Sequence, residues 1–273
     1  MSTMTMRDAF RFSRVRTFLF FLCILVLRLT RVVDLQAQWS AAAVDSICAH
    51  GDPRAAVTAC TTLLAISTRH PAGRDTAYIN RGNAYDELGD SQRALADYDS
   101  ALAVNPSNAH AYRNKGVTFI RLNRLDEALW AFGAAVRADP YYANAWANHA
   151  DLLRAATDTA ADPMPLMKQA VLEYNRALAL GTLDERLKWT VYVGRGLLEY
   201  SLRRFTESVA DLTVGIQLEA SAFVHAARAE SYAEAGNRVR AMNDVDSAAR
   251  LARTPRDSQV VKMARDYVTR KQQ

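Results

Sequence analysis

The sequence has few of the residues that interrupt helices or cross-link small folds. Seven prolines and eleven glycines among 273 residues exclude a collagen-like chain and a low-complexity, disordered one. Three cysteines are too few for a disulfide-dense scaffold. Half of the residues are apolar, which at this length is ample for a packed core.

The excess of positive charge is small, and most of it lies at the N-terminus. The formal net charge is +5, and residues 1–37 contain six arginines and two aspartates, which account for +4 of it. The remaining chain is nearly neutral and has no strong electrostatic field for a polyanion. We therefore expect no nucleic-acid partner.

No catalytic motif is present. The sequence lacks the G-x-S-x-G, P-loop, H-E-x-x-H and Rossmann glycine patterns. The five histidines are scattered, and His149 and His225 are expected to pack or hydrogen-bond locally rather than to bind metal. These absences predict a protein that is not an enzyme, with no metal, no cofactor and no small-molecule substrate.

The first 37 residues have the pattern of an export signal. Four arginines precede an uninterrupted apolar run over residues 18–27. This order is typical of a secretory signal peptide, and the run is about half the length of roughly 20 residues that a spanning helix needs. Three interpretations stay open: a signal cleaved near Ala37, an uncleaved anchor with residues 15–33 in the membrane, and a cytosolic chain with a leader-like start. The first predicts export to the periplasm or cell envelope, and the second predicts inner-membrane anchoring.

The rest of the chain repeats itself at an offset of 34 residues. Residues 75–108 overlay residues 109–142 at many independent positions. The matches are Tyr78 with Tyr112, Gly82 with Gly116, Tyr85 with Phe119, Ala94 with Ala128, Tyr98 with Phe132, Ala101 with Ala135 and Pro106 with Pro140. The pattern resembles the tetratricopeptide repeat, an antiparallel helix pair of 34 residues. The resemblance implies an all-α fold, a right-handed α-solenoid of helix-turn-helix repeats with a C-terminal capping helix.

Small residues recur where the two helices of each repeat cross. A side chain larger than alanine at these positions would push the helices apart. In the first helices the residues are Gly82, Gly116, Ala150, Gly196 and Ala229; in the second they are Ala94, Ala128, Ala170, Ser208 and Ala241. Gly89 is expected to supply a positive φ in the turn, and Pro106 and Pro140 to end the second helices.

The repeats divide the chain into segments. A degenerate helix pair is predicted over 38–72, a repeat domain over 75–255 and a capping helix over 256–273. The five repeats are 75–108, 109–142, 143–184, 189–221 and 222–255. We expect residues 157–165 to form a loop, with Pro163 and Pro165 preventing helix there, and residues 185–188 to form a linker. Asp257 or Ser258 is expected to cap the last helix.

Two cysteines remain after the leader. Cys48 and Cys60 flank one turn of the degenerate pair, and in an oxidising compartment a disulfide could join its two helices. The stretch around them also resembles the start of envelope tetratricopeptide proteins of proteobacteria, in which a cysteine pair precedes the repeats. The alternative is two small, buried apolar side chains.

A row of asparagines is the sharpest functional feature. Asn80, Asn114 and Asn148 are spaced by 34 residues, each two residues before the crossing position. In solenoids that this chain resembles, such a ladder hydrogen-bonds the backbone of an extended peptide, and an amide has the donors and the acceptor for it. Residues expected near this surface are Asn83, Arg113, Asn144, Asp151 and Arg154. The alternative is that asparagine is simply common at this place in the repeat. Arg113, Asn83 and Asn114 match only loosely the set with which some co-chaperones clamp a C-terminal carboxylate.

These features predict a non-enzymatic scaffold that binds an extended segment of a protein partner in its concave groove. The alternative function is a membrane-anchored assembly factor of the cell envelope that contacts folded partners through its convex face.

Overall fold

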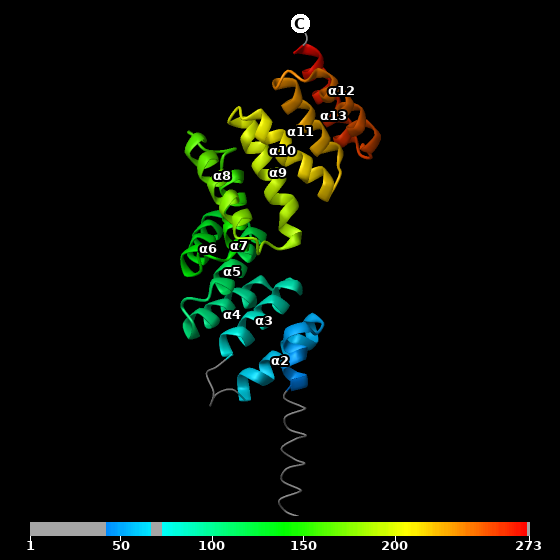
Figure 1. Cartoon of the computed structure of the whole chain (residues 1–273). Coiled ribbons are helices and arrows are strands. Elements are labelled where there is room, and N and C mark those ends of the chain that lie inside the picture. Colours follow the sequence, from blue (N-terminus) through cyan, green and yellow to red (C-terminus); the bar gives the residue numbers. More distant parts are fainter. Residues whose placement is uncertain (1–41, 67–72, 272–273) are drawn as a thin grey trace, which may run out of the picture. The chain divides into compact units, whose positions relative to one another are not determined.

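Every regular element of the described chain is an α-helix. The computed structural model describes residues 42–66 and 73–271 (Figure 1). A first helix covers residues 42–50. The others are α2 (Pro53–Ile66), α3 (Arg74–Glu87), α4 (Ser91–Val104), α5 (Ala109–Arg121), α6 (Leu125–Ala138), α7 (Ala143–Ala156), α8 (Met164–Ala179), α9 (Glu185–Ser201), α10 (Phe205–Leu218), α11 (Ala222–Glu234), α12 (Arg238–Leu251) and α13 (Pro255–Arg270). The predicted all-α class is confirmed.

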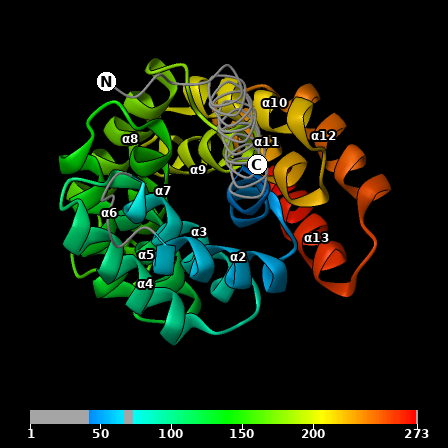
Figure 2. The same cartoon turned by 90° about the horizontal axis from the view of Figure 1, so that it is seen from below.

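The chain forms two compact units, divided within α4. The first ends at Asp97 and the second begins at Tyr98. In the second unit α5 packs on α6, α7 on α8, α9 on α10 and α11 on α12, and each pair contacts the next. We call α3, α5, α7, α9 and α11 the A helices, and α4, α6, α8, α10 and α12 the B helices. Figure 2 shows the A helices of the second unit along the inner side of its curve and the B helices outside.

The small residues at the crossings are needed for the close approach of the helices. A Cβ atom at Gly116 in α5 would lie 2.6 Å from the Phe132 ring of α6. At Gly196 in α9 it would lie 3.0 Å from Leu212 of α10. The facing residues Ala128 and Ala170 are fully buried. The sequence-based reason for these small residues is thus confirmed at the crossing of α5 with α6.

An ion pair joins most A helices to their own B helix. Arginines of α3, α9 and α11 each form two hydrogen bonds to a buried aspartate, with N–O distances of 2.6–2.8 Å. The pairs are Arg81–Asp97, Arg195–Asp211 and Arg228–Asp244. In α7 the corresponding residue is His149, whose Nδ1 lies 2.6 Å from Oε2 of Glu173. In α5 it is Lys115, which pairs instead with Asp99 of the preceding B helix.

Three local predictions are corrected. Helix α9 begins at Glu185, so residues 185–188 are helical and not a linker; Asp184 caps the helix by accepting from the Arg186 N–H. Helix α8 begins at Met164 and includes Pro165, because proline is tolerated in the first helical turn, where its missing N–H would have no partner. The last helix is capped by Thr254, not by Asp257 or Ser258.

The capping of α13 is reciprocal. The Thr254 hydroxyl accepts from the Asp257 N–H at 3.1 Å, and the Asp257 carboxylate accepts from the Thr254 N–H at 2.9 Å. The Asp257 carboxylate accepts from the backbone N–H groups of Arg253 and Thr254, and these two bonds lower the pKa of Asp257. The buried face of α13 (Val261, Ala264 and Val268) covers α11 and α12.

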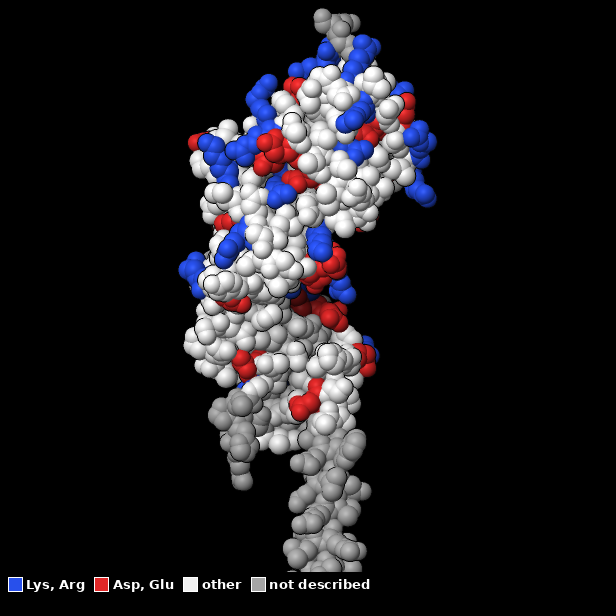
Figure 3. All heavy atoms as spheres, in the orientation of Figure 1, with Lys and Arg blue, Asp and Glu red and all other residues white. Residues whose placement is uncertain are grey.

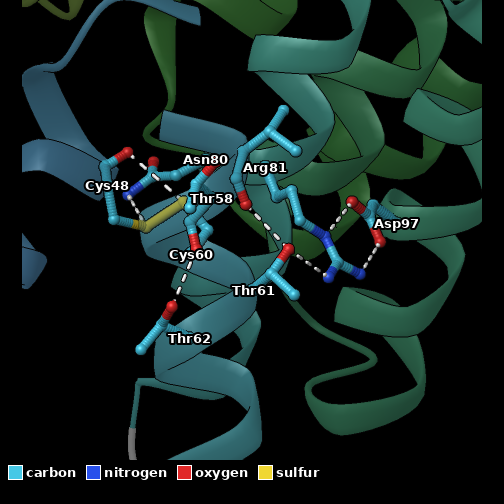
Figure 4. The surroundings of a disulfide bond; sticks show 9 residues. Cys48, Thr58, Cys60, Thr61, Thr62, Asn80, Arg81 and Asp97 are labelled. Atoms are coloured by element: carbon cyan, nitrogen blue, oxygen red, sulfur yellow. Dashed lines mark hydrogen bonds and ion pairs between the residues drawn. A yellow bond between two sulfur atoms is a disulfide. The ribbon is translucent and has the colours of Figure 1, made fainter. Parts of the chain in front are cut away.

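In the first unit a disulfide joins the helix of residues 42–50 to α2. Cys48 and Cys60 are both buried and pack with Val44, Ala59 and Leu63 (Figure 4). Helix α2 also contacts α3, where Arg81 donates to the Thr61 hydroxyl at 3.1 Å. The cross-link therefore holds a short pair of helices that buries little apolar surface by itself.

Replacing Gly116 with alanine should destabilise the protein by up to about 2 kcal/mol. Alanine gains about 1 kcal/mol of helix propensity, but overpacking against Phe132 costs typically 1–3 kcal/mol. Urea unfolding followed by circular dichroism measures the difference. The matched control is Gly133→Ala in α6, where a Cβ would lie no closer than 3.3 Å to a neighbouring side chain. That variant should be neutral or more stable. Equal effects of the two substitutions would contradict the crossing argument.

Reduction of the disulfide should destabilise the first unit by roughly 2–3 kcal/mol, the chain-entropy value for a loop of this size. Amides of α2 should then exchange with solvent faster in reductant, whereas amides of α9 and α10 should not respond, because repeats contact only their neighbours. Cys48→Ser/Cys60→Ser should exchange like the reduced protein and ignore reductant. Unchanged exchange of α2 in the wild type would show that the bond contributes nothing.

Candidate functional site

All seven predicted peptide-binding residues lie on A helices. Asn80 and Asn83 belong to α3 of the first unit. The other five belong to α5 and α7 of the second unit: Arg113, Asn114, Asn144, Asn148 and Asp151. The predicted site therefore falls into two groups, one in each unit.

The first group faces the disulfide. Asn80 and Asn83 line a cavity of about 110 Å³ together with Cys48, Pro53 and Glu87. The Asn80 amide nitrogen lies 4.0 Å from Cys48 Sγ, a long N–H···S contact (Figure 4). The disulfide therefore lies beside the Asn80 side chain at this cavity.

In the second group, Arg113 and Asn148 have hydrogen-bonding atoms without partners. Helix α5 lies beside α7. Arg113 Nη1 donates to Asn114 Oδ1 at 3.2 Å, but Arg113 Nε has no acceptor within the described chain. Asn148 Oδ1 is likewise buried and has no donor there. This region therefore contains one buried donor and one buried acceptor without a partner. Each such atom costs about 1–3 kcal/mol of folding stability.

Asn144 has a different task from the one that the sequence suggested. Its Oδ1 accepts from the Asp184 N–H at 2.9 Å. This bond ties the start of α7 to the residue that caps α9. The oxygen of Asn144 is thus engaged in holding the backbone between repeats.

Asp151 lies in a network with Arg154 and Tyr174. The Tyr174 hydroxyl donates to Asp151 Oδ1 at 3.1 Å, and Arg154 Nη2 donates to the same atom at 3.0 Å. Burial raises the pKa of Tyr174, so its hydroxyl keeps its proton. Burial disfavours the charge of Arg154, but the neighbouring Asp151 carboxylate outweighs this and raises the pKa of Arg154.

The Tyr174 hydroxyl is a part of the site that the sequence analysis does not include. A Cβ atom at Gly194 would lie 2.6 Å from Tyr174 Oη, so glycine is required there. Gly194 stands two residues before Gly196, the place in α9 that Asn148 has in α7, so the asparagine ladder does not continue into α9. Two signals in the sequence could have revealed this: a tyrosine where the preceding repeat has Phe132, and a glycine where the ladder expects asparagine.

Two histidines of the A helices pair with carboxylates. The ring Nδ1 of His225 lies 3.0 Å from Asp244, and His149 pairs with Glu173 as described above. Over residues 42–66 and 73–271, no group of three or more metal-ligating side chains is present. The face drawn in Figure 3 mixes side chains of both charge signs.

No helix of the described chain is long and apolar enough to cross a membrane. The predicted leader (1–37) and the predicted anchor (15–33) lie outside the described residues. The predicted limits of the leader, the repeats and the cap stay predictions.

Comparison with solved structures identifies the fold. YrrB, described as a tetratricopeptide protein with an unusual peptide-binding site, has a TM-score of 0.60 at 21% identity over 76% of this chain and 97% of its own. PilF of Pseudomonas aeruginosa has a TM-score of 0.55 at 18% identity over 74% and 90%. PilW, a type IV pilus biogenesis factor, has a TM-score of 0.55 at 16% identity over 71% and 86%. No curated protein sequence matches the chain.

A family model supports the same assignment from the sequence. Residues 79–143 match the tetratricopeptide repeat. This stretch contains the last part of α3 and all of α4, α5 and α6. Tetratricopeptide folds are scaffolds for protein–protein interaction, and no catalytic family is indicated. Residues 79–143 thus match the tetratricopeptide repeat, and the fold of the described chain is the right-handed α-solenoid of the solved tetratricopeptide proteins.

Proposed function

We propose that the A-helix face of the second unit binds an extended peptide segment of a protein partner. The observation that carries the proposal is the pair of unpartnered atoms on neighbouring helices. Arg113 Nε is a donor and Asn148 Oδ1 is an acceptor. A peptide unit offers a C=O for the first and an N–H for the second. An extended backbone is the ligand class that supplies both groups at regular spacing.

The surroundings of these atoms favour recognition by a rigid surface. Asn114 is held by Arg113, and Asp151 is held by Arg154 and Tyr174. Side chains that are already fixed lose little conformational entropy on binding. Asp151 and Arg154 would select polar side chains of the peptide, while Asn114 and Asn148 would hold its backbone. YrrB, a tetratricopeptide protein of similar fold with an unusual peptide-binding site, is consistent with this use of the fold.

Two parts of the earlier prediction have less support. Asn144 already bonds the backbone of Asp184, so we assign it to positioning α7 rather than to the ligand. Asn80 and Asn83 remain predicted contacts of the first unit. The alternative of a membrane-anchored assembly factor in the cell envelope depends on residues 15–33, as does the proposal of export.

Replacing Asn114 and Asn148, the two ladder asparagines of the second unit, should weaken peptide binding at least about fivefold. A library of random 12-residue peptides is displayed and selected on the immobilised full chain, and selected peptides are titrated against Asn114→Ala/Asn148→Ala. Two lost hydrogen bonds of about 0.5–1.5 kcal/mol each correspond to roughly 5- to 160-fold. Asn80→Ala is measured separately, because its residue lies in the other unit.

A stability measurement separates a binding role from a structural one. Asn148→Ala removes a buried acceptor that has no partner, so it should leave the free energy of unfolding unchanged or raise it while binding falls. The matched control is Asn243→Ala, an exposed asparagine of α12. Peptides that bind the double variant as tightly as the wild type, or a selection that enriches no peptide over the double variant, would refute the proposal.

A further inference from the structure

The cation at the equivalent position of each A helix bonds to the second helix of the preceding helix pair, with one exception. Arg81, Lys115, Arg195 and Arg228 all donate to an oxygen-bearing side chain there, at 2.5–3.1 Å. The acceptors are Thr61 of α2, Asp99 of α4, Asn175 of α8 and Thr213 of α10. Each acceptor directly follows a buried residue at the helix crossing, which is Cys60, Tyr98, Tyr174 or Leu212. One oxygen per junction therefore links successive helix pairs.

The exception is the junction of α6 with α7. The residue after the crossing residue Phe132 is Gly133, which has no side chain to donate to or accept from. Facing it is His149, in place of the usual arginine or lysine. A Cβ atom at Gly133 would lie 3.5 Å from His149 Nε2 and 3.3 Å from Arg137 Nη1. The two nitrogens thus converge on a place that an oxygen occupies at the other junctions.

The missing side chain coincides with a hollow that Gly133 itself lines. Its volume is about 520 Å³, and it lies between α6, α7 and α8 in the second unit. Leu129, Val136 and two indole rings give it apolar walls. Trp130 is 56% exposed although it is a large aromatic residue, and Tyr112 holds its ring edge-on at 5.9 Å. Trp146 is fixed because its indole N–H donates to the Pro140 carbonyl at 3.0 Å.

The contact with Glu173 bears on which ring nitrogen of His149 carries a hydrogen. Nδ1 lies 2.6 Å from Glu173 Oε2, and in the neutral ring the tautomer that makes this hydrogen bond carries its hydrogen on Nδ1. In the neutral ring, Nε2 is then an acceptor that faces the hollow. Arg137 Nη1 can only donate. A group that bonds to both must donate one hydrogen bond and accept another, which is what a hydroxyl does.

Two features of the hollow select among hydroxyl-bearing occupants. The walls are two tryptophans and aliphatic side chains, which favour an aromatic body. Asp126 and Glu173 line the same hollow and disfavour a carboxylate. An aromatic ring with a hydroxyl at its tip satisfies both conditions.

We propose that this hollow is a second binding site, which accepts a tyrosine side chain of a protein partner. The ring lies against Trp130 and Trp146, and the phenol oxygen accepts from Arg137 and donates to His149 Nε2. None of the lining residues belongs to the proposed peptide-binding face, so the two proposals stand or fall separately.

The test titrates the isotope-labelled full chain with N-acetyl-tyrosinamide and follows the indole N–H resonances by NMR. Saturable shifts are expected for Trp130 and Trp146, which Trp→Phe variants assign. Trp189 donates to the Glu219 carbonyl outside the hollow and should not shift. N-acetyl-phenylalaninamide lacks the hydroxyl and should bind at least fivefold more weakly. Equal affinity of the two probes, or shifts that spare Trp130 and Trp146, would overturn the proposal.

Two variants test the geometry. Gly133→Thr places a hydroxyl of the protein itself in the hollow, as Thr61 and Thr213 do at the other junctions. This variant should bind the tyrosine probe at least tenfold more weakly. Trp130→Ala should also weaken it, about tenfold. The matched control is Leu172→Ala, an exposed apolar residue of α8 that does not line the hollow. Circular dichroism verifies that each variant is folded. Unchanged binding by folded Gly133→Thr, or a loss in Leu172→Ala as large as that in Trp130→Ala, would refute the site.

Discussion

The interaction on which the repeat geometry depends is the arginine of α3, α9 and α11, which bonds to its own B helix and to the helix that precedes its repeat. Arg195 shows the arrangement fully, since it bonds Asp211 of its own repeat and Asn175 of the preceding one. Burying an ion pair is weak evidence for added stability, because the cost of desolvation offsets much of the attraction. Its effect is on specificity, because only one rotation and one height of the A helix satisfy both partners. The pair thus fixes how one repeat meets the next.

The ion pairs fix the orientation of the A helices, and the close helix crossings provide the packing between the helices of a repeat. At Gly116 the α5 backbone lies so near Phe132 that even a methyl group would collide, whereas at Ala150 a methyl group is accommodated and fully buried. Between two repeats, the hydroxyl of the crossing residue Ser208 in α10 lies 2.9 Å from the Ser231 hydroxyl of α11, so these two buried groups satisfy each other. Different repeats therefore achieve the same close packing of helices with different side chains. Because contacts are confined to neighbours, such local substitutions do not disturb distant repeats.

The sequence predicts the helix pairs, their crossings and their turns because these features recur at a fixed offset. The left-handed turn residue Gly89 and the prolines at 106 and 140 also follow from local chemistry. The pairing of Arg81, Arg195 and Arg228 with aspartates 16 residues later is visible in the sequence, but a charge pair on two helices is normally solvated. Only the packing reveals that the aspartates are buried. The engagement of Asn144 with Asp184 involves a contact 40 residues away, which no repeat pattern encodes.

Two glycines stand where the repeat pattern is broken. The space beside one of them is filled by a side chain of the protein, and the space beside the other is not. At Gly194 the asparagine of the ladder is missing, and the space that its side chain would start from is closed by the hydroxyl of Tyr174, which also bonds Asp151. At Gly133 the linking oxygen is missing, and no side chain of the described chain occupies the hollow that results. Within one unit the protein thus uses a tyrosine hydroxyl to complete one vacancy left by a glycine. The hollow at Gly133 has aromatic walls and two nitrogens directed at the same place. A tyrosine side chain from another molecule would fill this hollow in the way that Tyr174 fills the space at Gly194.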